Sequence, residues 1–569
     1  MCASASHSNT NVDDDDVNER SLVITLDERS SRVKTRRPPT RKFQSQNNKE
    51  KPQPEADRLQ PQLKKVQTKK AQTKKPLAKK PLTKTATPAK PKSTKKPGDI
   101  SWEETSRFHN SNGDKPFVEV SGPARTFTKQ MTPLQIFEHF FSQKLIETIT
   151  VETNRYHQQQ KPNDIKWNPV TTEELYAFLG LLLAMGITNL PDIHENWAKE
   201  PITNVSWFTT ILRRDRFCDI LCFLHLANNE TQPPKESPEY KLHKMGSVID
   251  ILSKNFRSNY HPGRDVAIDE MMIGTRCRTS FIQYMPKKPV KFGIKMWALC
   301  ESKTGYCLEF QLYKDKENDT AEKGLTFRVC TDLMKNYYGK NHHLYTDNFY
   351  TSCALYNHLE KHDTYGCGTI KKKNGRFPED FKCEKWEKGT TKYLKSGNLL
   401  AVRWVDKRDV FLISNIHSTG MVEITRKTRE VIQKPLMIDQ YNHYMRGVDK
   451  CDQYQSNYDI ARKSRKWWKK VFLRMFELAV INSYIVYRAL NPEINGKKAN
   501  RSHRLFRFAL IHEMVQILLD ARADPNDGAN VERNGRPSTS DSSRLSGKHF
   551  PKKECVFCLW LQNSKWKED

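Results

Sequence analysis

The chain has 569 residues, and 96 Lys and Arg against 66 Asp and Glu give it a formal net charge of +30 at pH 7. This excess favours a polyanionic partner such as nucleic acid over a neutral metabolite. We find no uninterrupted apolar run long enough to span a bilayer and no apolar N-terminal stretch typical of a signal peptide, so we expect an intracellular protein without a membrane partner. Its thirteen cysteines are odd in number and scattered, which is typical of reduced thiols.

Residues 1–115 are expected to form a disordered, Lys- and Pro-rich tail. Aromatic residues are almost absent from the first hundred positions, and Lys pairs recur every five residues from Lys64 to Lys80 with no acid between them. A five-residue period matches neither helix nor strand, so an extended cationic segment is predicted. We interpret it as a nuclear-import signal that also attracts DNA, rather than as a solubilising tail. The expected location is therefore the nucleus, reached through the nuclear import machinery.

Residues 116–262 are predicted to form the first part of an all-α domain. Thr132 and Pro133 suit the N-cap and first turn of a helix. Thr171 and Glu174 make a capping box before the apolar run LYAFLGLLLAMGI. The stretch WFTTILRRDRFCDILCFLHLANN has the apolar spacing of another amphipathic helix.

From residue 263 the apolar period changes from helical to alternating. RDVAIDEMMIG, KFGIKMWALCES and YCLEFQLYK predict three consecutive strands, the last two joined by a turn at Lys303 to Gly305. A helix, a strand, a helix and a strand are expected next, at about 320–337, 342–346, about 351–361 and in YGCGTI. This is the element order of a ribonuclease H-like sheet. We therefore predict an α/β protein whose ribonuclease H-like catalytic core starts with residues 263–370.

The rest of the chain divides by the same kinds of pattern. Residues 371–434 are predicted as a β-rich insertion, with a hairpin in LLAVRWVDKRDVFLISNI. Helical character resumes in YNHYMRGVDKCDQYQSNY, within a second part of the core over residues 435–459. It continues in WWKKVFLRMFELAVINSYIVYRAL, within a second helical segment over residues 460–522. Residues 523–569 are rich in Asn, Gly, Ser and Arg and are expected to be disordered.

Carboxylates occupy matching positions in the predicted core. In a ribonuclease H-like sheet the first strand lies beside the fourth, so Asp269 on the first and Asp347 on the fourth should meet. Asp449 and, three residues later, Asp452 share a helical face and offer further acids. Such a cluster suits phosphoryl transfer, in which two hard divalent cations held by carboxylates activate the attacking oxygen and stabilise the leaving one. Taken singly, each acid could equally cap a helix, lie on a solvated face or lie at a sheet edge.

Cationic side chains surround this predicted acid site. RCRTSFIQYMPKKPVK places Lys and Arg around Phe281 and Tyr284, which fits phosphate contact with base stacking; a solvated loop with two core rings is the alternative. ARKSRKWWKK carries six more cations at a helix start, including Lys469 and Lys470, whereas its tryptophans are expected in the core. The predicted DNA contacts are Arg276, Arg278, Lys287, Lys288, Lys291, Asn348, Lys371, Lys372, Lys373, Arg462, Lys463, Arg465 and Lys466.

The order and spacing of five sequence blocks carry a specific resemblance. The blocks are AIDEMMIGTRCRTSFIQYMPKKPVKFGIKMWALCESKTGY, YTDNFYTS, GTIKK, HYMRGVDKCDQY and RKSRKWWKKVFLRMFELAVINSY. Together they resemble the piggyBac transposase family over roughly residues 120–520. The resemblance implies catalytic aspartates at Asp269, Asp347 and Asp449, with Asp452 as an additional acid near the metals.

The resemblance also implies an activity, a cofactor and partners. It implies cut-and-paste transposition that excises DNA at transposon ends through a hairpin intermediate and integrates it at TTAA sites. The implied cofactor is Mg²⁺, as two ions, with Mn²⁺ as an alternative. It further implies a homodimer whose helical DNA-binding domain is assembled from residues 116–262 and 460–522.

The C-terminal stretch KKECVFCLWLQNSKWKED departs from the resemblance. Many members of the family continue into a zinc-binding module that recognises transposon ends, whereas Cys555 and Cys558 have no later Cys or His. Two ligands cannot close a tetrahedral structural site, so no zinc site is expected within this chain. Two other functions compete with an active transposase: a domesticated, non-catalytic DNA-binding or chromatin protein, and a structure-specific nuclease of the same fold. The intact acids favour the transposase, while the missing zinc ligands favour the DNA-binding protein.

Overall fold

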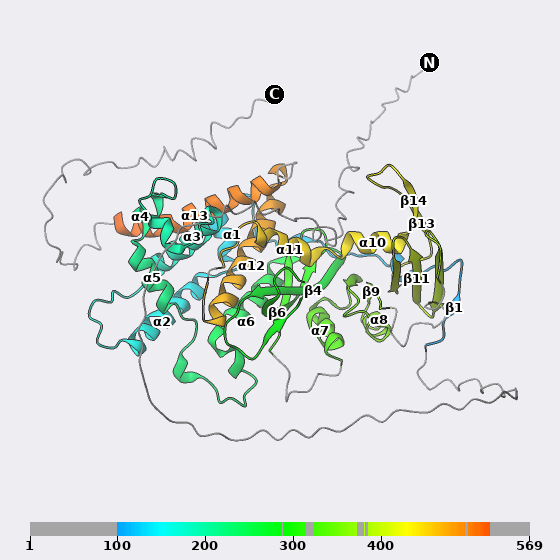
Figure 1. Ribbon diagram of the computed structural model, residues 1–569, viewed down its shortest axis with the longest axis horizontal. Coiled ribbons are helices and arrows are strands. Elements are labelled where there is room, and N and C mark those ends of the chain that lie inside the picture. Colours follow the sequence, from blue (N-terminus) through cyan, green and yellow to red (C-terminus); the bar gives the residue numbers. More distant parts are fainter. Residues whose placement is uncertain are drawn as a thin grey trace, which may run out of the picture. The chain divides into compact units, whose positions relative to one another are not determined.

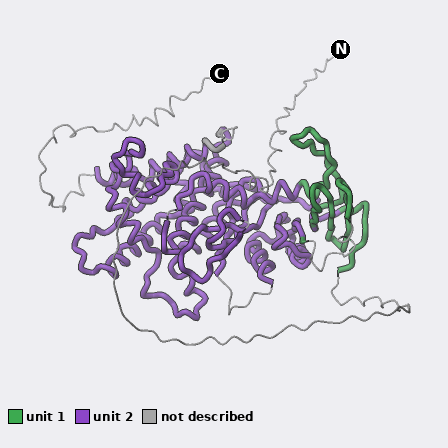
Figure 2. Tube along the Cα trace, in the orientation of Figure 1, with its two compact units in different colours: residues 1–109, 371–412, 417–439 green, residues 110–370, 413–416, 440–569 purple. Residues whose placement is uncertain are grey.

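The computed structural model of the chain describes residues 100–286, 288–314, 324–371, 381, 385–461, 463–494 and 499–523. None of the helices in these ranges combines the length and apolar character needed to cross a membrane. The chain divides into two compact units (Figure 2). Unit 1 takes the described parts of residues 1–109, 371–412 and 417–439, and unit 2 takes those of residues 110–370, 413–416 and 440–569.

Unit 1 consists mainly of antiparallel strands in the part of the chain predicted as an insertion. Its strands are β1 (Glu103–Glu104), β10 (Thr391–Ser396), β11 (Leu399–Val405), the first part of β12 (Asp409–Ser414), β13 (Met421–Thr425) and β14 (Val431–Pro435). β1 pairs with β10, so ordered structure starts ahead of the predicted boundary at residue 116. Arg403 is buried between the Trp386 ring, 3.8 Å from the guanidinium, and the Asp409 carboxylate at 3.0 Å.

Unit 2 contains a mixed sheet. Its strands are β4 (Asp265–Gly274), β5 (Ile282–Tyr284), β6 (Phe292–Glu301), β7 (Cys307–Leu312), β8 (His342–Thr346) and β9 (Thr364–Thr369). β6 pairs antiparallel with β4, β5 and β7, while β8 pairs parallel with both β4 and β9. The predicted pairing of the first long strand with the fourth, β4 with β8, is therefore confirmed, whereas β5 was not predicted.

Helices cover the sheet of unit 2. They are α7 (Leu325–Met334), α8 (Cys353–Glu360) and α11 (Gly447–Ser456), which follows α10 (Leu436–Tyr444). α11 packs on β4 and β6, α7 packs on β6 and β7, and α8 packs on β9 (Figure 1). The strands are buried between such layers, which is why their sequences are almost continuously apolar.

Helices from before and after the sheet pack together in unit 2. They are α1 (Pro133–Glu138), α2 (Gln143–Gln160), α3 (Thr172–Thr188), α4 (Trp207–Ile211), α5 (Arg214–Phe223), α6 (Val248–Ser258), α12 (Trp467–Leu490) and α13 (Ala499–Ala523), with the short pair β2 (Gly122–Pro123) and β3 (Tyr260–His261). α13 lies along α3, and α1 contacts both α12 and α13 (Figure 1). A fully buried ion pair between Glu477 and Arg507 joins α12 to α13. Thr132 is the N-cap of α1, as predicted, and forms a capping box with Gln135. Of the capping box predicted at Thr171 and Glu174 only half is present: Thr171 accepts from the Glu174 N–H at 3.2 Å, while the Glu174 carboxylate accepts from Arg216.

The predicted single helix beginning at Trp207 is wrong, because the chain breaks between α4 and α5. Leu212 and Arg213 adopt extended conformations, with ψ values of 142° and 145°. The carbonyl of Leu212 instead accepts a hydrogen bond from the Trp197 indole at 2.8 Å, and that of Ile211 accepts one from Arg522 at 2.8 Å. Contacts from distant segments thus stabilise a break that the apolar periodicity does not show.

Candidate functional site

The register between β4 and β8 places two predicted acids next to each other. Ile268 and Thr346 form the last residue pair of this parallel ladder, and Asp269 and Asp347 are the residues that follow them. Neighbouring strands lie about 4.8 Å apart. The two carboxylates therefore start from adjacent backbone positions at the same edge of the sheet.

Asp347 shapes a turn but does not cap the next helix. One of its carboxylate oxygens accepts a hydrogen bond from the Phe349 N–H at 2.8 Å. Helix α8 begins later and is capped by Ser352, whose hydroxyl oxygen accepts from the Leu355 N–H at 3.2 Å. Burial raises the pKa of Asp347, and the negative charge of Glu270 adds to this rise.

Asp269 lies in a still more enclosed environment. Burial raises its pKa well above the usual range, the positive charge of Lys288 opposes this shift, and the charge of Glu270 adds to it. Glu270 itself accepts a hydrogen bond from the Lys295 ammonium at 2.8 Å, and both side chains are largely buried. This pair was not predicted from the sequence. The sequence signal that could have indicated it is the glutamate in AIDE and the lysine in GIK, which lie on adjacent antiparallel strands.

Helix α11 brings the other two predicted acids to the same sheet edge. Asp449 is exposed, yet the protein atoms around it displace enough water to raise its pKa, and nearby Asp452 adds to this rise. Asp452 is held by Arg474 of α12, whose guanidinium donates to its carboxylate at 2.5 Å. The buried Arg474 also reaches the sulfur of Met271 on β4, at 3.0 Å. α12 therefore fixes Asp452 relative to the strand that carries Asp269.

Lys288 links these acids. Its ammonium donates a hydrogen bond to the carbonyl oxygen of Glu270 at 3.2 Å. Burial alone would lower the pKa of Lys288, but the nearby carboxylates raise it above its usual value; they are Asp269, Glu270, Asp452 and Asp449. The charge of Lys288 also lowers the pKa of Asp347. Lys288, which was predicted to contact DNA, therefore interacts electrostatically with all four predicted acids.

A divalent metal ion suits this site by donor chemistry. Carboxylate oxygens are the ligands that Mg²⁺ and Mn²⁺ prefer, and the electrostatic environment already holds a positive charge among them. Within the described ranges, no three His, Cys, Asp or Glu side chains converge closely enough to form a ligand set.

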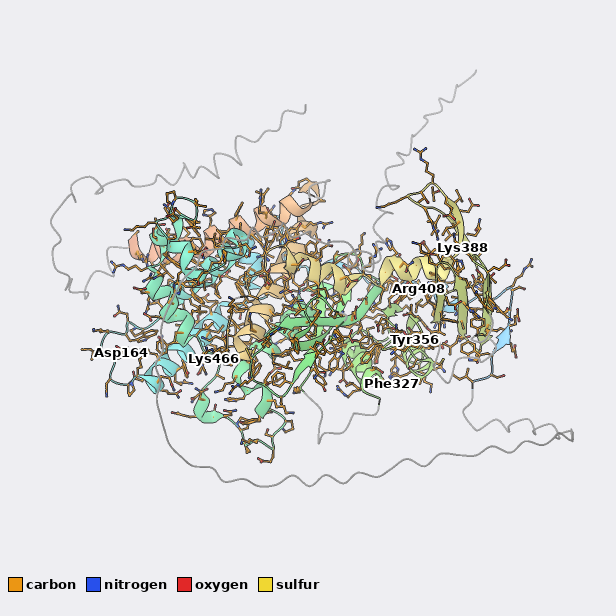
Figure 3. All side chains as sticks on the ribbon, in the orientation of Figure 1. Asp164, Phe327, Tyr356, Lys388, Arg408 and Lys466 are labelled. Atoms are coloured by element: carbon orange, nitrogen blue, oxygen red, sulfur yellow. The ribbon has the colours of Figure 1, made fainter. Side chains whose placement is uncertain are left out.

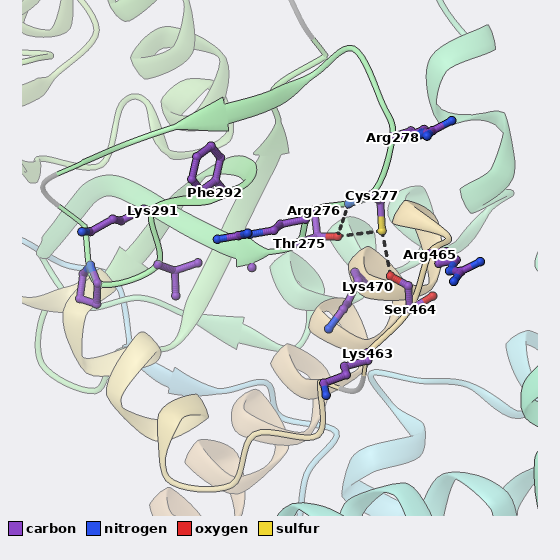
Figure 4. A pocket seen from close by; sticks show the side chains of 13 residues that line it. Thr275, Arg276, Cys277, Arg278, Lys291, Phe292, Lys463, Ser464, Arg465 and Lys470 are labelled. Atoms are coloured by element: carbon purple, nitrogen blue, oxygen red, sulfur yellow. Dashed lines mark hydrogen bonds between the residues drawn. The ribbon is translucent and has the colours of Figure 1, made fainter. Parts of the chain in front are cut away.

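Two predicted cationic segments line a single groove of about 1170 Å³ (Figure 4). Its charged lining residues are Arg276, Arg278, Lys291, Lys463, Arg465 and Lys470, and none of its thirteen lining residues is acidic. The Cys277 thiol connects the segments by donating to the Ser464 carbonyl at 3.1 Å. All the charged residues that line the groove are therefore cationic, which suits an anionic ligand.

The other predicted contacts have different surroundings. Lys466, labelled in Figure 3, is exposed. Its ammonium donates to the Tyr156 hydroxyl of α2 at 3.3 Å. Lys469 is buried and donates to the carbonyls of Leu221 and Cys222 at the end of α5, and burial lowers its pKa to about 8. Its expected role in phosphate binding is therefore wrong. Asn348 and Lys371 are exposed and stay predictions.

The predicted rings divide between core and surface. Phe281 is only 2% exposed and packs edge-on against Trp467, with centroids 5.0 Å apart, so the expectation that it stacks on bases is wrong. Trp468 is buried as predicted. Tyr284 is 58% exposed, and its neighbour Phe292, which the sequence reading missed, is 41% exposed.

Several predictions lie outside the described residues. They are the Lys pairs of the N-terminal tail and Lys287, Lys372, Lys373, Arg462, Cys555 and Cys558. The nine cysteines that the structure does describe are all free thiols, and seven are buried, as expected for reduced cysteines.

Comparison with known proteins identifies the family. A family model described as Transposase IS4 matches residues 132–484, more than half of the chain. The human PiggyBac transposable element-derived protein 3 is 28% identical over 389 residues, covering 65% of this chain and 64% of that protein, which is just under two thirds of its length. The human PiggyBac transposable element-derived protein 5 is 24% identical over 433 residues, covering 71% of this chain and 80% of that protein.

A solved structure also shares the fold. It is a cryo-EM structure of a piggyBac transposase synaptic complex with hairpin DNA, which matches with a TM-score of 0.63 and 24% identity over 75% of this chain and 91% of that chain. Taken with the family match, this likeness shows that the chain belongs to the IS4 transposase family, among its piggyBac-type members.

Proposed function

We propose that this protein is a DNA transposase that excises and integrates DNA at TTAA sites by metal-dependent phosphoryl transfer through a hairpin intermediate. The observation that carries the proposal is the parallel register that sets Asp269 beside Asp347. The strand order β7–β6–β4–β8–β9 is the one expected of a ribonuclease H-like core, which supports the assignment. A role in the nucleus as a homodimer belongs to the same proposal and is supported by the basic N-terminal sequence and by the family.

Each of the residues at the acid site and in the groove would have a defined role in this reaction. Asp269, Asp347 and Asp449 would hold the metal through carboxylate oxygens, and Asp452, fixed by Arg474, would support them. Mg²⁺ or Mn²⁺ would supply Lewis-acid activation of the attacking and leaving oxygens. Because burial raises the pKa of Asp269, this carboxyl must lose its proton before it can serve. The cations of the groove would hold the DNA phosphates.

The test is a cleavage and joining assay with the full chain, Mg²⁺ and labelled DNA containing TTAA-flanked ends. Asp347→Asn should reduce product formation at least about a thousandfold, because it removes metal affinity without removing volume. DNA affinity and melting temperature should stay close to wild type. Asp332→Asn, a change at a partly exposed acid paired with Arg328 on α7, is the matched control and should cleave normally.

The competing function is DNA binding without catalysis. The cationic groove supports it, because its lining contains no acid and needs no metal. Equal DNA binding with no products from either wild type or Asp347→Asn, across several candidate ends, would favour this function. Loss of stability together with activity in Asp347→Asn would instead make Asp347 a structural turn residue.

A further inference from the structure

Two exposed aromatic rings lie at the loop end of the β5–β6 hairpin. Among the large hydrophobic side chains exposed in the described residues, the aromatic ones are Tyr284, Phe292 and Phe349. Tyr284 and Phe292 lie directly opposite each other in the ladder, with centroids 4.6 Å apart and 33° between the ring planes. Two adjacent exposed rings leave apolar area in water, which is typical of a binding surface.

Arg276 also lies against Phe292. The guanidinium lies 5.2 Å from the Phe292 centroid, and the Thr275 N–H donates to the Phe292 carbonyl at 3.2 Å. Figure 4 shows Arg276 reaching toward Phe292. We call Tyr284, Phe292 and Arg276 the stacking row. Both rings and guanidinium groups offer flat faces on which a nucleobase can stack.

The stacking row adjoins the cationic groove. Arg276 and Phe292 line the groove themselves, and Lys291 lies next to Phe292 in the chain. A nucleotide has a flat base and an anionic phosphate, so it matches a surface with rings beside cations. In a paired duplex each base face is covered by the next base pair, which leaves no face free for the protein. Away from the ends of a duplex, only an unpaired base can therefore use the stacking row.

We propose that the stacking row binds an unpaired base of DNA while the groove cations hold the phosphates of the same strand. The inference rests on the proposed function, because it takes DNA as the ligand. It goes further in assigning this surface to locally melted DNA rather than to intact duplex. Tyr284 and Phe292 would be binding residues and would take no part in the chemistry.

The test compares two labelled duplexes of equal length and sequence context, one fully paired and one with a short central bubble that carries 2-aminopurine. Wild type should bind the bubble more tightly and quench the 2-aminopurine fluorescence. The double variant Tyr284→Leu/Phe292→Leu keeps the apolar bulk but loses the π-faces, so its bubble affinity should fall roughly five- to a hundredfold. Its affinity for the paired duplex and its melting temperature should stay unchanged, because both rings are exposed.

Two controls separate stacking from phosphate contact. Tyr284→Phe/Phe292→Tyr keeps both rings and should keep the bubble preference. Lys463→Ala should lower the affinity of the protein for both duplexes by the same factor. No bubble preference in wild type, or a preference that survives in the leucine variant, would overturn the inference while leaving duplex binding and the proposed function intact. Failure of wild type to bind either duplex would overturn the proposed function as well.

Discussion

Lys288 is the residue on which the electrostatics of the acid site depend. Without a cation, four carboxylates at one sheet edge would repel one another. The Lys288 ammonium reduces this repulsion and is anchored by the Glu270 carbonyl at 3.2 Å. Lys288 is thus an internal counter-ion of these carboxylates. Its charge is positive, like that of the divalent ion that we propose for the same region.

Lys288→Met should therefore destabilise the metal-free protein by about 2 kcal/mol, between the values for exposed and buried ion pairs. Mg²⁺ should raise the melting temperature of this variant more than that of wild type, because the competing ammonium is gone. Urea denaturation and thermal unfolding with and without Mg²⁺ measure both effects. Lys291→Met, an exposed change in the same loop, should alter stability by less than about 0.5 kcal/mol. If Mg²⁺ raised the melting temperature of Lys288→Met and of wild type by the same amount, the counter-ion role of Lys288 would be contradicted.

The positions of the acids could be predicted from the sequence, but the interaction of Lys288 with them could not. Strand patterning and element order suffice to place Asp269 and Asp347, because a parallel ladder fixes adjacent positions. Lys288 belongs to a loop whose path depends on the unpredicted strand β5 and its pairing with β6. A lysine in a loop rich in Lys and Pro gives no sign of which charge it will face.

At the scale of elements, the site depends on how closely α11 approaches the sheet. A Cβ atom at Gly447 would lie 3.0 Å from the carbonyl oxygen of Glu301 and 3.1 Å from that of Cys300. Gly305 in the β6–β7 turn has a φ of 79°, and a Cβ there would lie 2.9 Å from Lys450. Glycine at both positions lets the start of α11 rest against the sheet, and this contact positions Asp449 and Asp452.

Gly447→Ala should push α11 away from β6. Because the obstructing atoms belong to the backbone, the change should cost about 1–3 kcal/mol in unfolding free energy. DNA cleavage should fall by more than the loss of folded protein explains, while DNA affinity stays constant. Gly420→Ala, where a Cβ meets nothing closer than 4.0 Å, is the control and should keep activity. Full cleavage activity in Gly447→Ala would show that the position of α11 is not critical.

Element prediction succeeded where local chemistry decides and failed where distant contacts decide. The strand predicted over 342–346 matches β8, because a short buried run between turn residues has few alternatives. The break between α4 and α5 escaped prediction because Trp197 and Arg522, remote in sequence, hold the carbonyls of Leu212 and Ile211.

At the scale of the whole molecule, folding concentrates positive charge that the sequence spreads out. Cys277 and Ser464 are 187 residues apart, yet their hydrogen bond joins the two sides of the groove. Each segment was predicted to be cationic, but their convergence depends on the packing of α12 against β4 and could not be read from composition. The net charge of +30 indicated the class of ligand, and the fold determines one place where it can bind.

The salt dependence of DNA binding should show how many DNA phosphates the cations of this groove neutralise. The logarithm of the association constant should fall linearly with the logarithm of salt concentration, by about 0.9 per phosphate neutralised. Lys463→Ala/Arg465→Ala should reduce this slope by about 2. Lys388→Ala/Lys395→Ala removes the same charge, but both lysines are paired with glutamates, so the slope should change less. Fluorescence anisotropy titrations across a salt series measure this, and equal slope changes in the two variants would argue against the groove.

The most direct measurement is to locate the metal ion itself. Replacing Mg²⁺ by Fe²⁺ with ascorbate and peroxide produces hydroxyl radicals at the bound ion, and these cut the nearby backbone. We expect cuts beside residues 269, 347 and 449 that disappear with excess Mg²⁺ and in Asp269→Asn. Cuts confined to other segments, or cuts at these residues that persist in Asp269→Asn, would contradict a metal site built from β4, β8 and α11.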